Sequence, residues 1–414
     1  MNYEQAESYL LDLELFGMRF GLDRMHKLMT VLGMPQRRFA SVHVVGSNGK
    51  SSTARMIAAI LERHGLRTGA YTSPHLRSFS ERIEVGEKPI ADADFAAAVT
   101  RVAHAASLVN RTAAEDDRVT QFEALTAAAY HELARRGVEV AVIEAGLGGR
   151  YDATNVIPSK VQVLTSVGLE HTRWLGPTIA DIAREKLDVV RDHATLVTGP
   201  LPDEAEEVVE RVVAERHARR VRAEASDDVP VPKRALGRFQ RQNFALARAA
   251  AEAFLGSLSD DAAAAAAASV RVPGRLELVS SDGPLVFHDG AHNPAGAAAL
   301  AEALPEVVGE RRLVAVIGVL DDKDAAAMLR AILPLTDAAV YTRTSNPRSL
   351  PPATLQALAA QLDGPLAECV ADPRAALERA RALAGPDGAV IATGSIYLIA
   401  DLVRERASAR VSRL

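Results

Sequence analysis

The sequence predicts an α/β protein of two domains, each built on a mostly parallel β-sheet with helices on its faces. The chain has 414 residues, which is the length of two or three typical domains. Its apolar, β-branched runs do not alternate with polar residues, as in strands that are covered on both faces. Strand-like runs, polar loops and helical stretches also follow one another repeatedly, which is typical of doubly wound folds. We place the domains at residues 1–272 and 273–414, with the boundary near Pro273.

The N-terminal domain is expected to start with helix and to continue as strand, loop and helix. The first part of the chain predicts helix because apolar side chains recur at helical spacing, at Tyr9, Leu10, Leu13, Phe16 and Met18. The run SVHVV (41–45) predicts a strand with His43 in the core, and residues 51–65 predict a helix. Two further apolar runs, at 139–145 and 161–171, predict strands that end in polar residues.

The middle of the chain shows weaker patterns, and the C-terminal part is regular again. Residues 206–222 predict a charged amphipathic helix, and the acids and prolines of 225–234 predict a linker. Helices are expected over 243–256 and over the alanine run 261–269, because Ala is the best helix former. Four units of strand, polar loop and helix then predict a smaller, Rossmann-like domain, at residues 284–304, 311–333, 338–362 and 388–403.

Composition excludes several classes of protein. The net charge of −5 argues against a general nucleic-acid binder. The single cysteine, Cys369, excludes a disulfide framework and a cysteine-based zinc cluster. No apolar run approaches the ~18 residues of a membrane span, and acids precede the apolar residues at the N-terminus, unlike a signal peptide. We therefore expect a soluble, cytoplasmic enzyme without a membrane or nucleic-acid partner.

The sharpest local signal is GSNGKSS, which lies between the first predicted strand and its helix. Glycines let backbone N–H groups point into a tight turn, and the following helix adds its positive end. Lys50 would supply a point charge for the outer phosphates, and Ser51 or Ser52 a hydroxyl for magnesium. The spacing departs from the common phosphate-loop form, since Val44 stands where the first glycine would be. The alternative is a glycine turn that happens to hold a lysine.

Polar residues that could join this loop follow three predicted strands. They are Ser73 and His75 in YTSPH, Glu144 in VIEAGLGG, and Glu170 and His171 in GLEHTRWLG. Ligands bind beyond the carboxyl ends of parallel strands, and this donor set suits a magnesium ion that carries nucleotide phosphates. Alternatively, the glutamate caps a loop and the histidine is a satisfied polar residue.

Lysines are scarce in this chain, which has seven of them among 48 Lys and Arg residues. In so arginine-rich a chain, a lysine indicates a position where arginine would not serve. Three of the seven, Lys50, Lys186 and Lys323, fall in motifs. For Lys186 the residues alone favour a solvated helix lysine that pairs with Asp181 or lies near Glu185.

Ten motifs, in order from about residue 40 to residue 398, resemble the folylpolyglutamate synthetase and dihydrofolate synthetase family of the Mur ligase superfamily. They are GSNGKSS, YTSPHLRSFSERIEV, VIEAGLGGRYDATNV, GLEHTRWLG, IAREK, GRFQRQN, PGRLE, DGAHNPAG, GVLDDKD and ATGS. The resemblance implies a P-loop-type ATPase domain that binds ATP, Mg²⁺ and a folate- or pteroate-like carboxylate. A second domain would close over them and bring L-glutamate. We expect a monomer that forms an amide through an acyl phosphate and releases ADP and phosphate.

The same resemblance implies roles for individual residues. Phosphates would be held by Gly46, Ser47, Asn48, Gly49, Lys50, Ser51 and Ser52. The rest of the nucleotide would be bound by Asn243, which would face adenine, and by Arg275, Asp289 and His292. Magnesium would be held by Ser73, Glu144, His171 and, once carbamylated, Lys186. Catalysis would fall to Lys50, His171 and Lys186. The substrates would meet Phe122 on the pterin side and, for the amino acid, Lys323, Arg348 and Ser395.

Two departures from the family pattern concern the surroundings of the proposed carbamate and the pocket for the substrate acid. LDVV follows Lys186 where the family usually has a small residue and glycine. The stretch 190–237 is shorter than expected, as if a strand pair were missing. One alternative is therefore a related ligase that joins another acid to an amino acid or amine. A second alternative is a P-loop NTPase or nucleotide-dependent switch.

Overall fold

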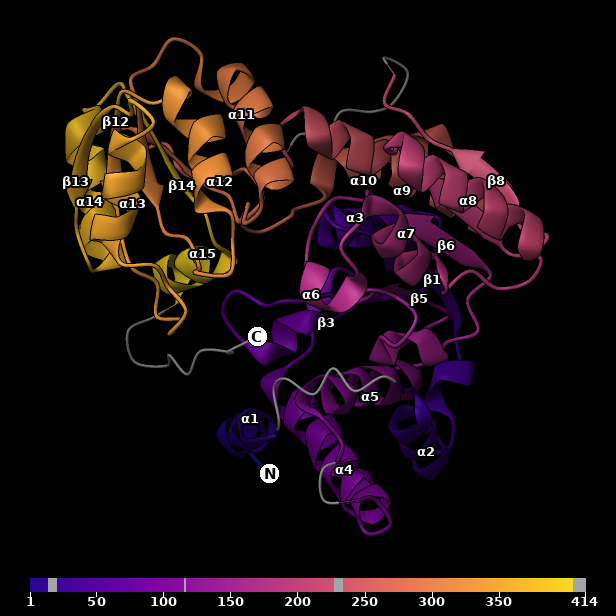
Figure 1. The fold of residues 1–414 in the computed structure, drawn as a ribbon. Helices are drawn as coiled ribbons and strands as arrows, with labels where there is room; N and C mark the ends of the chain where they lie inside the picture. Colours follow the sequence, from indigo (N-terminus) through magenta and orange to yellow (C-terminus); the bar gives the residue numbers. More distant parts are fainter. Residues whose placement is uncertain (14–20, 115–116, 227–233, 405–414) are drawn as a thin grey trace. The chain divides into compact units, whose positions relative to one another are not determined.

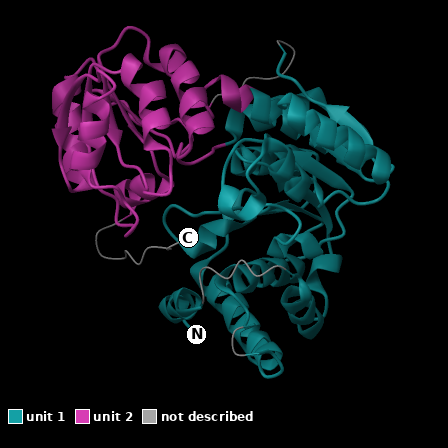
Figure 2. Ribbon diagram, in the orientation of Figure 1, with its two compact units in different colours: residues 1–231, 242–270, 414 teal, residues 232–241, 271–413 magenta. Residues whose placement is uncertain are grey.

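The computed structural model describes residues 1–13, 21–114, 117–226 and 234–404. Its contacts divide the chain into two units (Figure 2). Unit 1 holds Met1–Val231 and Gln242–Val270, together with Leu414, and unit 2 holds Pro232–Arg241 and Arg271–Arg413. The assignment of 232–241 to unit 2 is a feature that the sequence did not predict.

Unit 1 is built on an eight-stranded sheet in the order β4-β3-β2-β5-β1-β6-β7-β8. Six strands run parallel, and three of them, β1, β5 and β6, are the buried strands that the apolar runs predicted. The six are β1 (Ala40–Val45), β2 (Thr68–Tyr71), β5 (Val140–Glu144), β6 (Val161–Leu164), β7 (Thr195–Thr198) and β8 (Arg219–Arg222). The antiparallel edge is formed by β3 (Ile83–Val85) and β4 (Lys88–Pro89).

The central strand β1 lies between β5 and β6, and its last residues therefore reach the middle of the sheet edge. Within it His43 is 1% exposed, and its Nε2 lies 2.9 Å from Thr154 Oγ1. Burial, helped by the charge of Arg191, lowers the pKa of His43 to about 3. The prediction that His43 is a core residue is confirmed.

Helices cover unit 1 in groups that match its apolar cores. Beside one end of the sheet lie four helices that pack together (Figure 1), α1 (Tyr3–Asp12), α2 (Asp23–Val31), α4 (Asp92–Asn110) and α5 (Gln121–Arg135). The other helices are α3 (Lys50–Arg63), α6 (Thr172–Leu175), α7 (Ile179–Leu187), α8 (Asp203–Glu215), α9 (Arg238–Leu255) and α10 (Asp260–Ser269). The alanine run is thus helical, as predicted, and packs on α3. Of the apolar positions predicted for the first helix, Phe16 and Met18 lie outside the described residues.

The prediction of one helix over 206–222 is wrong at its C-terminal end. The helix α8 stops at Glu215, and Arg219–Arg222 form β8, which pairs with β7. A turn at His217, with φ 48°, separates the two. Strand pairing here overrides a charged segment that carries almost no β signal of its own. The stretch 190–237 therefore adds two strands to the sheet, and most of the predicted linker, 227–233, lies outside the described residues.

Unit 2 has a six-stranded sheet in the order β13-β12-β11-β14-β10-β9. The four predicted strand–helix units are present as β10 (Leu285–His288) with α11 (Pro294–Val308), β11 (Leu313–Ile317) with α12 (Ala325–Ile332), β12 (Ala338–Tyr341) with α13 (Pro352–Ala360), and β14 (Ala389–Thr393) with α15 (Ile396–Val403). A fifth unit, β13 (Leu366–Cys369) with α14 (Pro373–Ala384), and the antiparallel β9 (Glu277–Ser280) were not predicted. Both missed strands are edge strands with exposed residues, so neither forms an apolar run.

Across the described ranges of the chain, no helix is both long and apolar enough to cross a membrane.

Gly69 in β2 shows how tightly the helices pack on this sheet. A methyl group placed on it would lie 2.5 Å from Leu133 Cδ2 and 3.2 Å from Val138 Cγ1. Gly69→Ala should therefore lower the free energy of unfolding by about 1–3 kcal/mol, the usual cost of overpacking. Gly168→Ala is the control, because nothing lies within 4 Å of the added methyl group. Chemical denaturation measures both, and equal stability of the two variants would contradict the prediction.

Candidate active site

At two positions of the loop between β1 and α3, glycine is the only residue that fits. Gly46 has φ 147° and Gly49 has φ 85°. A methyl group on Gly46 would overlap Thr165 Oγ1, and one on Gly49 would overlap Asn243 Oδ1. The loop is therefore held between the segment that follows β6 and the helix α9. Because backbone atoms approach closely here, the sequence needs glycine at both positions.

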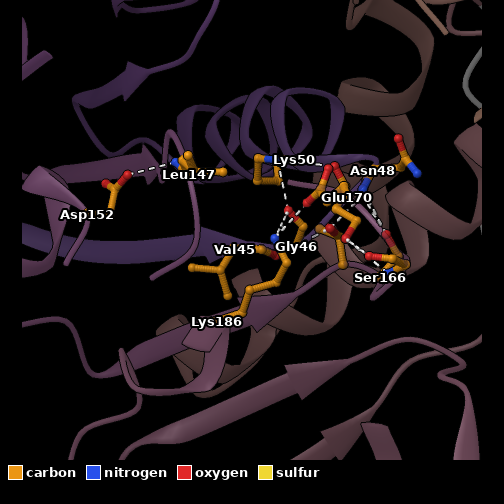
Figure 3. A network of polar contacts seen from close by, with 12 residues as sticks. Val45, Gly46, Asn48, Lys50, Leu147, Asp152, Ser166, Glu170 and Lys186 are labelled. Atoms are coloured by element: carbon orange, nitrogen blue, oxygen red, sulfur yellow. Dashed lines mark hydrogen bonds and ion pairs between the residues drawn. The ribbon is translucent and has the colours of Figure 1, made fainter. Parts of the chain in front are cut away.

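Side chains of the segment after β6 fix the orientation of the loop peptides (Figure 3). The N–H of Asn48 donates to Ser166 Oγ at 2.9 Å, and Thr165 Oγ1 donates to the carbonyl of Asn48 at 2.6 Å. Ser47 Oγ accepts a hydrogen bond from the N–H of Gly168 at 3.0 Å. The turn is thus rigid before any ligand arrives, which favours phosphate binding because no ordering has to be done afterwards.

Two lysines converge on this turn (Figure 3). Lys50 Nζ donates to the carbonyl of Gly46 at 2.8 Å and to that of Ser47 at 3.2 Å. Lys186 Nζ donates to the same Gly46 carbonyl at 3.0 Å. Two positive charges therefore lie where the sequence predicted phosphates to bind.

A cluster of oxygen atoms lies beside the loop, at the end of β5. Glu144 is 1% exposed. Its Oε1 accepts a hydrogen bond from Ser51 Oγ at 2.8 Å, and its Oε2 accepts one from the N–H of Ser73 at 2.9 Å. The structure thus brings together three of the residues predicted for magnesium and phosphate. Ser52 is buried at 3% exposure, so Ser51 is the hydroxyl that faces the carboxylate.

The two histidines predicted near the site differ in their surroundings. His75 is 7% exposed, and its Nδ1 accepts a hydrogen bond from Arg82 Nε at 3.0 Å. His171 is exposed, has φ 47°, and precedes the short helix α6. That helix carries the one tryptophan of the chain, Trp174, whose backbone N–H donates to the carbonyl of His171 at 2.8 Å. Within the described ranges, no three His, Cys, Asp or Glu side chains group as a metal-binding set. The predicted magnesium set includes a serine and a modified lysine, and it stays a prediction.

Lys186 is not the solvated helix lysine that its sequence context favoured. It is 1% exposed, and its Nζ lies 2.8 Å from Glu170 Oε1. Burial by itself raises the pKa of Glu170, but the charges of Lys186 and Lys50 outweigh it and bring that pKa to about 2. The Asp181 carboxylate instead accepts a hydrogen bond from Arg184 on the exposed face of the helix. The local pattern failed because the whole of α7 turns this side chain inward, toward the phosphate loop.

Burial lowers the pKa of Lys186, although the Glu170 carboxylate opposes that shift. A lower pKa makes the neutral amine more accessible, and the neutral amine is the form that adds CO₂ to give a carbamate. The ion pair with Glu170 competes with this reaction. Carbamylation of Lys186 stays a prediction.

The loop after β5 is anchored by Asp152, a residue that sequence reasoning did not single out. Asp152 Oδ2 accepts a hydrogen bond from the N–H of Leu147 at 2.8 Å (Figure 3). Burial raises the pKa of Asp152, and hydrogen bonds from this loop and from Thr154 oppose that shift. The ring of Phe122 packs on the same loop, since a methyl group on Gly146 would lie 2.5 Å from its Cζ. The predicted contact of Phe122 with the substrate stays a prediction.

In unit 2 the residues predicted for the nucleotide gather around Gly290. Arg275 Nη1 donates to the carbonyl of Gly290 at 3.1 Å, and His292 Nδ1 lies 3.0 Å from the same oxygen. Asp289 is buried and accepts the N–H groups of Leu276 and Ala291 at 2.8 and 2.7 Å. Burial raises the pKa of Asp289, against the pull of Arg275. Their role in nucleotide binding stays a prediction.

Two of the residues predicted for the amino acid share a carboxylate that was not predicted. Asp322 Oδ2 lies 2.9 Å from Lys323 Nζ and 3.5 Å from Arg348 Nη1. Burial by itself raises the pKa of Asp322, but the hydrogen bond and charge of Lys323 reverse this and lower it. The motif GVLDDKD offered this residue as a signal. Ser395 has a different hydrogen-bond partner. Its Oγ accepts a hydrogen bond from the N–H of Tyr397 and caps α15.

Comparison with known proteins decides the family. The "Mur ligase middle domain" matches residues 44–228, and the "Mur ligase, glutamate ligase domain" matches residues 274–396. The dihydrofolate synthase/folylpolyglutamate synthase of Mycobacterium tuberculosis is 37% identical over 388 residues, which are 83% of this chain and 78% of that protein. The chain belongs to the folylpolyglutamate synthase/dihydrofolate synthase family of Mur ligases. As a member of this family it is an ATP-dependent ligase that forms C–N bonds.

Solved structures agree with this assignment over nearly the whole chain. The M. tuberculosis folylpolyglutamate synthase complexed with ADP has a TM-score of 0.89 and 34% identity, and the match covers 97% of each chain. E. coli FolC in complex with DHPP and ADP has a TM-score of 0.86 and 28% identity, again over 97% of each chain. The folylpolyglutamate synthase family fold therefore extends through both units.

The Lys186 side chain provides a test of the predicted carbamate. Lys186→Arg keeps a positive charge beside Glu170 but cannot be carbamylated, so we expect ADP formation to fall to background. Arg184→Lys, on the exposed face of the same helix, is the control and should leave the rate unchanged. Both variants are compared by thermal unfolding and by ADP release.

A second measurement keeps this test decisive if the arginine does not fit. The parent protein, without any substitution, should lose activity when CO₂ is removed from the solution and regain it when bicarbonate is added. A Lys186→Arg variant as active as the parent would show that no carbamate is needed.

Proposed function

We propose that this chain adds L-glutamate to the carboxylate of a folate- or pteroate-type acid, with ATP as the energy source. The product would be an amide, formed through an acyl phosphate, with release of ADP and phosphate. We further propose that it acts as a monomer in the cytoplasm. The observation that carries the proposal is the rigid glycine loop with two lysines at Gly46, next to the oxygen cluster of Glu144, Ser51 and Ser73.

The residues at this site fit a magnesium–nucleotide complex. A buried carboxylate and neighbouring hydroxyl groups are the oxygen ligands that magnesium prefers. Glu144 and Ser51 would hold the ion, with Ser73 beside them. When bound, magnesium neutralises phosphate charge and stabilises the charge that develops during phosphoryl transfer. The glycine turn and Lys50 fit the phosphates, because the turn carries the Lys50 ammonium and lies at the N-terminus of α3.

The chemistry divides into two displacements. An oxygen of the substrate carboxylate attacks the γ-phosphorus of ATP, a P–O bond to ADP breaks, and an acyl phosphate forms. The amine of glutamate, after losing a proton, then attacks the acyl carbon, and inorganic phosphate leaves as the amide forms. Neither step requires a covalent bond to the protein. Positioning and charge stabilisation therefore supply the rate.

The chain's own residues have separate tasks in this scheme. Lys50 would neutralise the transferred phosphoryl group. Glu170 holds Lys186, and Lys186 in turn holds the Gly46 carbonyl, so the pair positions the loop. In unit 2 we assign nucleotide contacts to Arg275, Asp289 and His292. We assign the amino acid to Lys323, Arg348 and Ser395, with Asp322 positioning the first two.

The proposed reaction makes a stoichiometric prediction. ADP release should require both acids at once, dihydropteroate or a reduced folate together with L-glutamate, and each ADP should accompany one new amide bond. The measurement couples ADP detection to mass spectrometry of the product. Full-rate ADP release with neither acid would favour an NTPase. Turnover with another acid, but with no folate or pteroate, would move the chain to a ligase of different specificity.

Lys50→Ala removes the charge aimed at the transferred phosphoryl group. Loss of one such group typically costs about 3 kcal/mol, so ADP formation should fall roughly a hundredfold or more. Lys88→Ala, on the exposed edge strand β4, is the matched control and should retain the parent rate. Near-normal turnover of the Lys50 variant would contradict the phosphate-loop assignment.

A further inference from the structure

Unit 1 contains a pocket that the reaction proposed above does not use. It has a volume of about 650 Å³, within the usual range for small-molecule sites. Its walls come from α2, from residues 150–160 and from the end of α7, and include His26, Arg37 and Lys160. Arg37 shortly precedes β1 and Lys160 directly precedes β6, whereas Gly46 directly follows β1. The pocket therefore lies at the opposite end of these parallel strands from the phosphate loop.

The pocket is strongly basic in an acidic protein. Four cations line it, Arg37, Arg150, Lys160 and Arg191, and they are joined by His26. Its one carboxylate, Asp188, lies 3.9 Å from Arg150 Nε. The lining thus carries a formal charge of about +3, although the chain as a whole carries −5. Such a concentration of one sign attracts an anion into the pocket.

Among the four cations, Arg150 alone forms an ion pair with a residue that the structure describes, Asp188. Arg37 and Lys160 are exposed, and neither forms an ion pair with any residue that the structure describes. Arg191 is half-buried, and its Nη2 donates to the carbonyl and to Oδ1 of Asn155, each at 2.7 Å. That guanidinium is fixed in place before a ligand binds, which lowers the entropic cost of binding.

The distribution of positive side chains in the pocket favours a flexible chain of carboxylates over a nucleotide. The ring of Tyr151, the one aromatic side chain in the lining, is already covered by the guanidinium of Arg150, 5.1 Å from its centroid. That face of the Tyr151 ring is therefore not open to a nucleobase. Separated Arg and Lys side chains instead match an anion whose charges are themselves separated along a chain.

We propose that this pocket binds an oligo-γ-glutamyl tail, the chain of carboxylates that forms when the proposed reaction repeats on its own product. The identity of the ligand rests on the proposed function, whereas the pocket and its charge do not. Because the pocket and the phosphate loop lie at opposite ends of β1, a tail bound there leaves the phosphate loop free. The bound tail would belong to a finished product or to a second substrate molecule, and longer tails would bind more tightly.

The experiment measures the binding of tri-γ-glutamate to the whole chain by calorimetry, without ATP. The test variant is Arg37→Glu with Lys160→Glu, which reverses two exposed charges in the pocket. The control is Lys88→Glu with Arg211→Glu, which reverses two exposed charges outside it. We expect the test variant to bind about tenfold more weakly and the control to bind as the parent does. Added salt should weaken the parent's binding.

Three results would overturn the proposal. The first is no binding of tri-γ-glutamate to the parent at millimolar concentration, and the second is equal binding to the parent and the test variant. The third is binding of inorganic tripolyphosphate in the pocket without binding of the glutamate trimer. Ligase activity is measured separately on both variants with a monoglutamate substrate and should stay at the parent level. An error in the proposed function would show in the ligase assay, as a lack of activity in the parent. An error in the pocket assignment would show in the calorimetry.

Discussion

One backbone oxygen, the carbonyl of Gly46, accepts hydrogen bonds from two lysine ammonium groups. Two like charges this close repel each other, so the arrangement depends on a counter-charge. Glu170 supplies it, 2.8 Å from Lys186 and with a pKa of about 2. Glu170 pairs with Lys186, whereas the Lys50 ammonium is bonded in the turn to the carbonyls of Gly46 and Ser47. A triphosphate brings the charge that this turn lacks, and the same attraction that binds it also relieves the repulsion between the lysines.

The order of strands explains why the remaining polar groups meet at this point. In a parallel sheet all carboxyl ends lie on one edge, and here β5, β1 and β6 are neighbours. Glu144, Gly46 and Thr165 therefore lie at the ends of adjacent strands, on the same edge of the sheet. Asp152 then holds the segment after β5 in place through the N–H of Leu147. The site is rigid because each loop is bonded to the next one, and not because any single loop is stiff.

Much of this arrangement could be predicted from the sequence, and the failures have physical causes. Glycines, a lysine and a flanking strand and helix predicted the loop at 46–52, because that chemistry is local. The burial of Lys186 could not be read from its helix, since it depends on which face of α7 meets the sheet. The strand β8 and the edge strands β9 and β13 were missed because pairing with a neighbour, and not their own residues, makes them strands. Asp152 acts by holding the N–H of Leu147, a role that leaves no pattern in a single sequence, whereas Asp322 stands in the motif GVLDDKD and only its contacts with Lys323 and Arg348 reveal its role.

The single tryptophan has a practical consequence. Trp174 is 37% exposed, lies in the short helix α6, and is bonded through its backbone to His171 next to Glu170. All indole emission of the chain therefore comes from one position, one helical turn away from the candidate active site. Any change in indole emission on addition of a nucleotide would thus report on this one position, with no label attached and no background from a second indole.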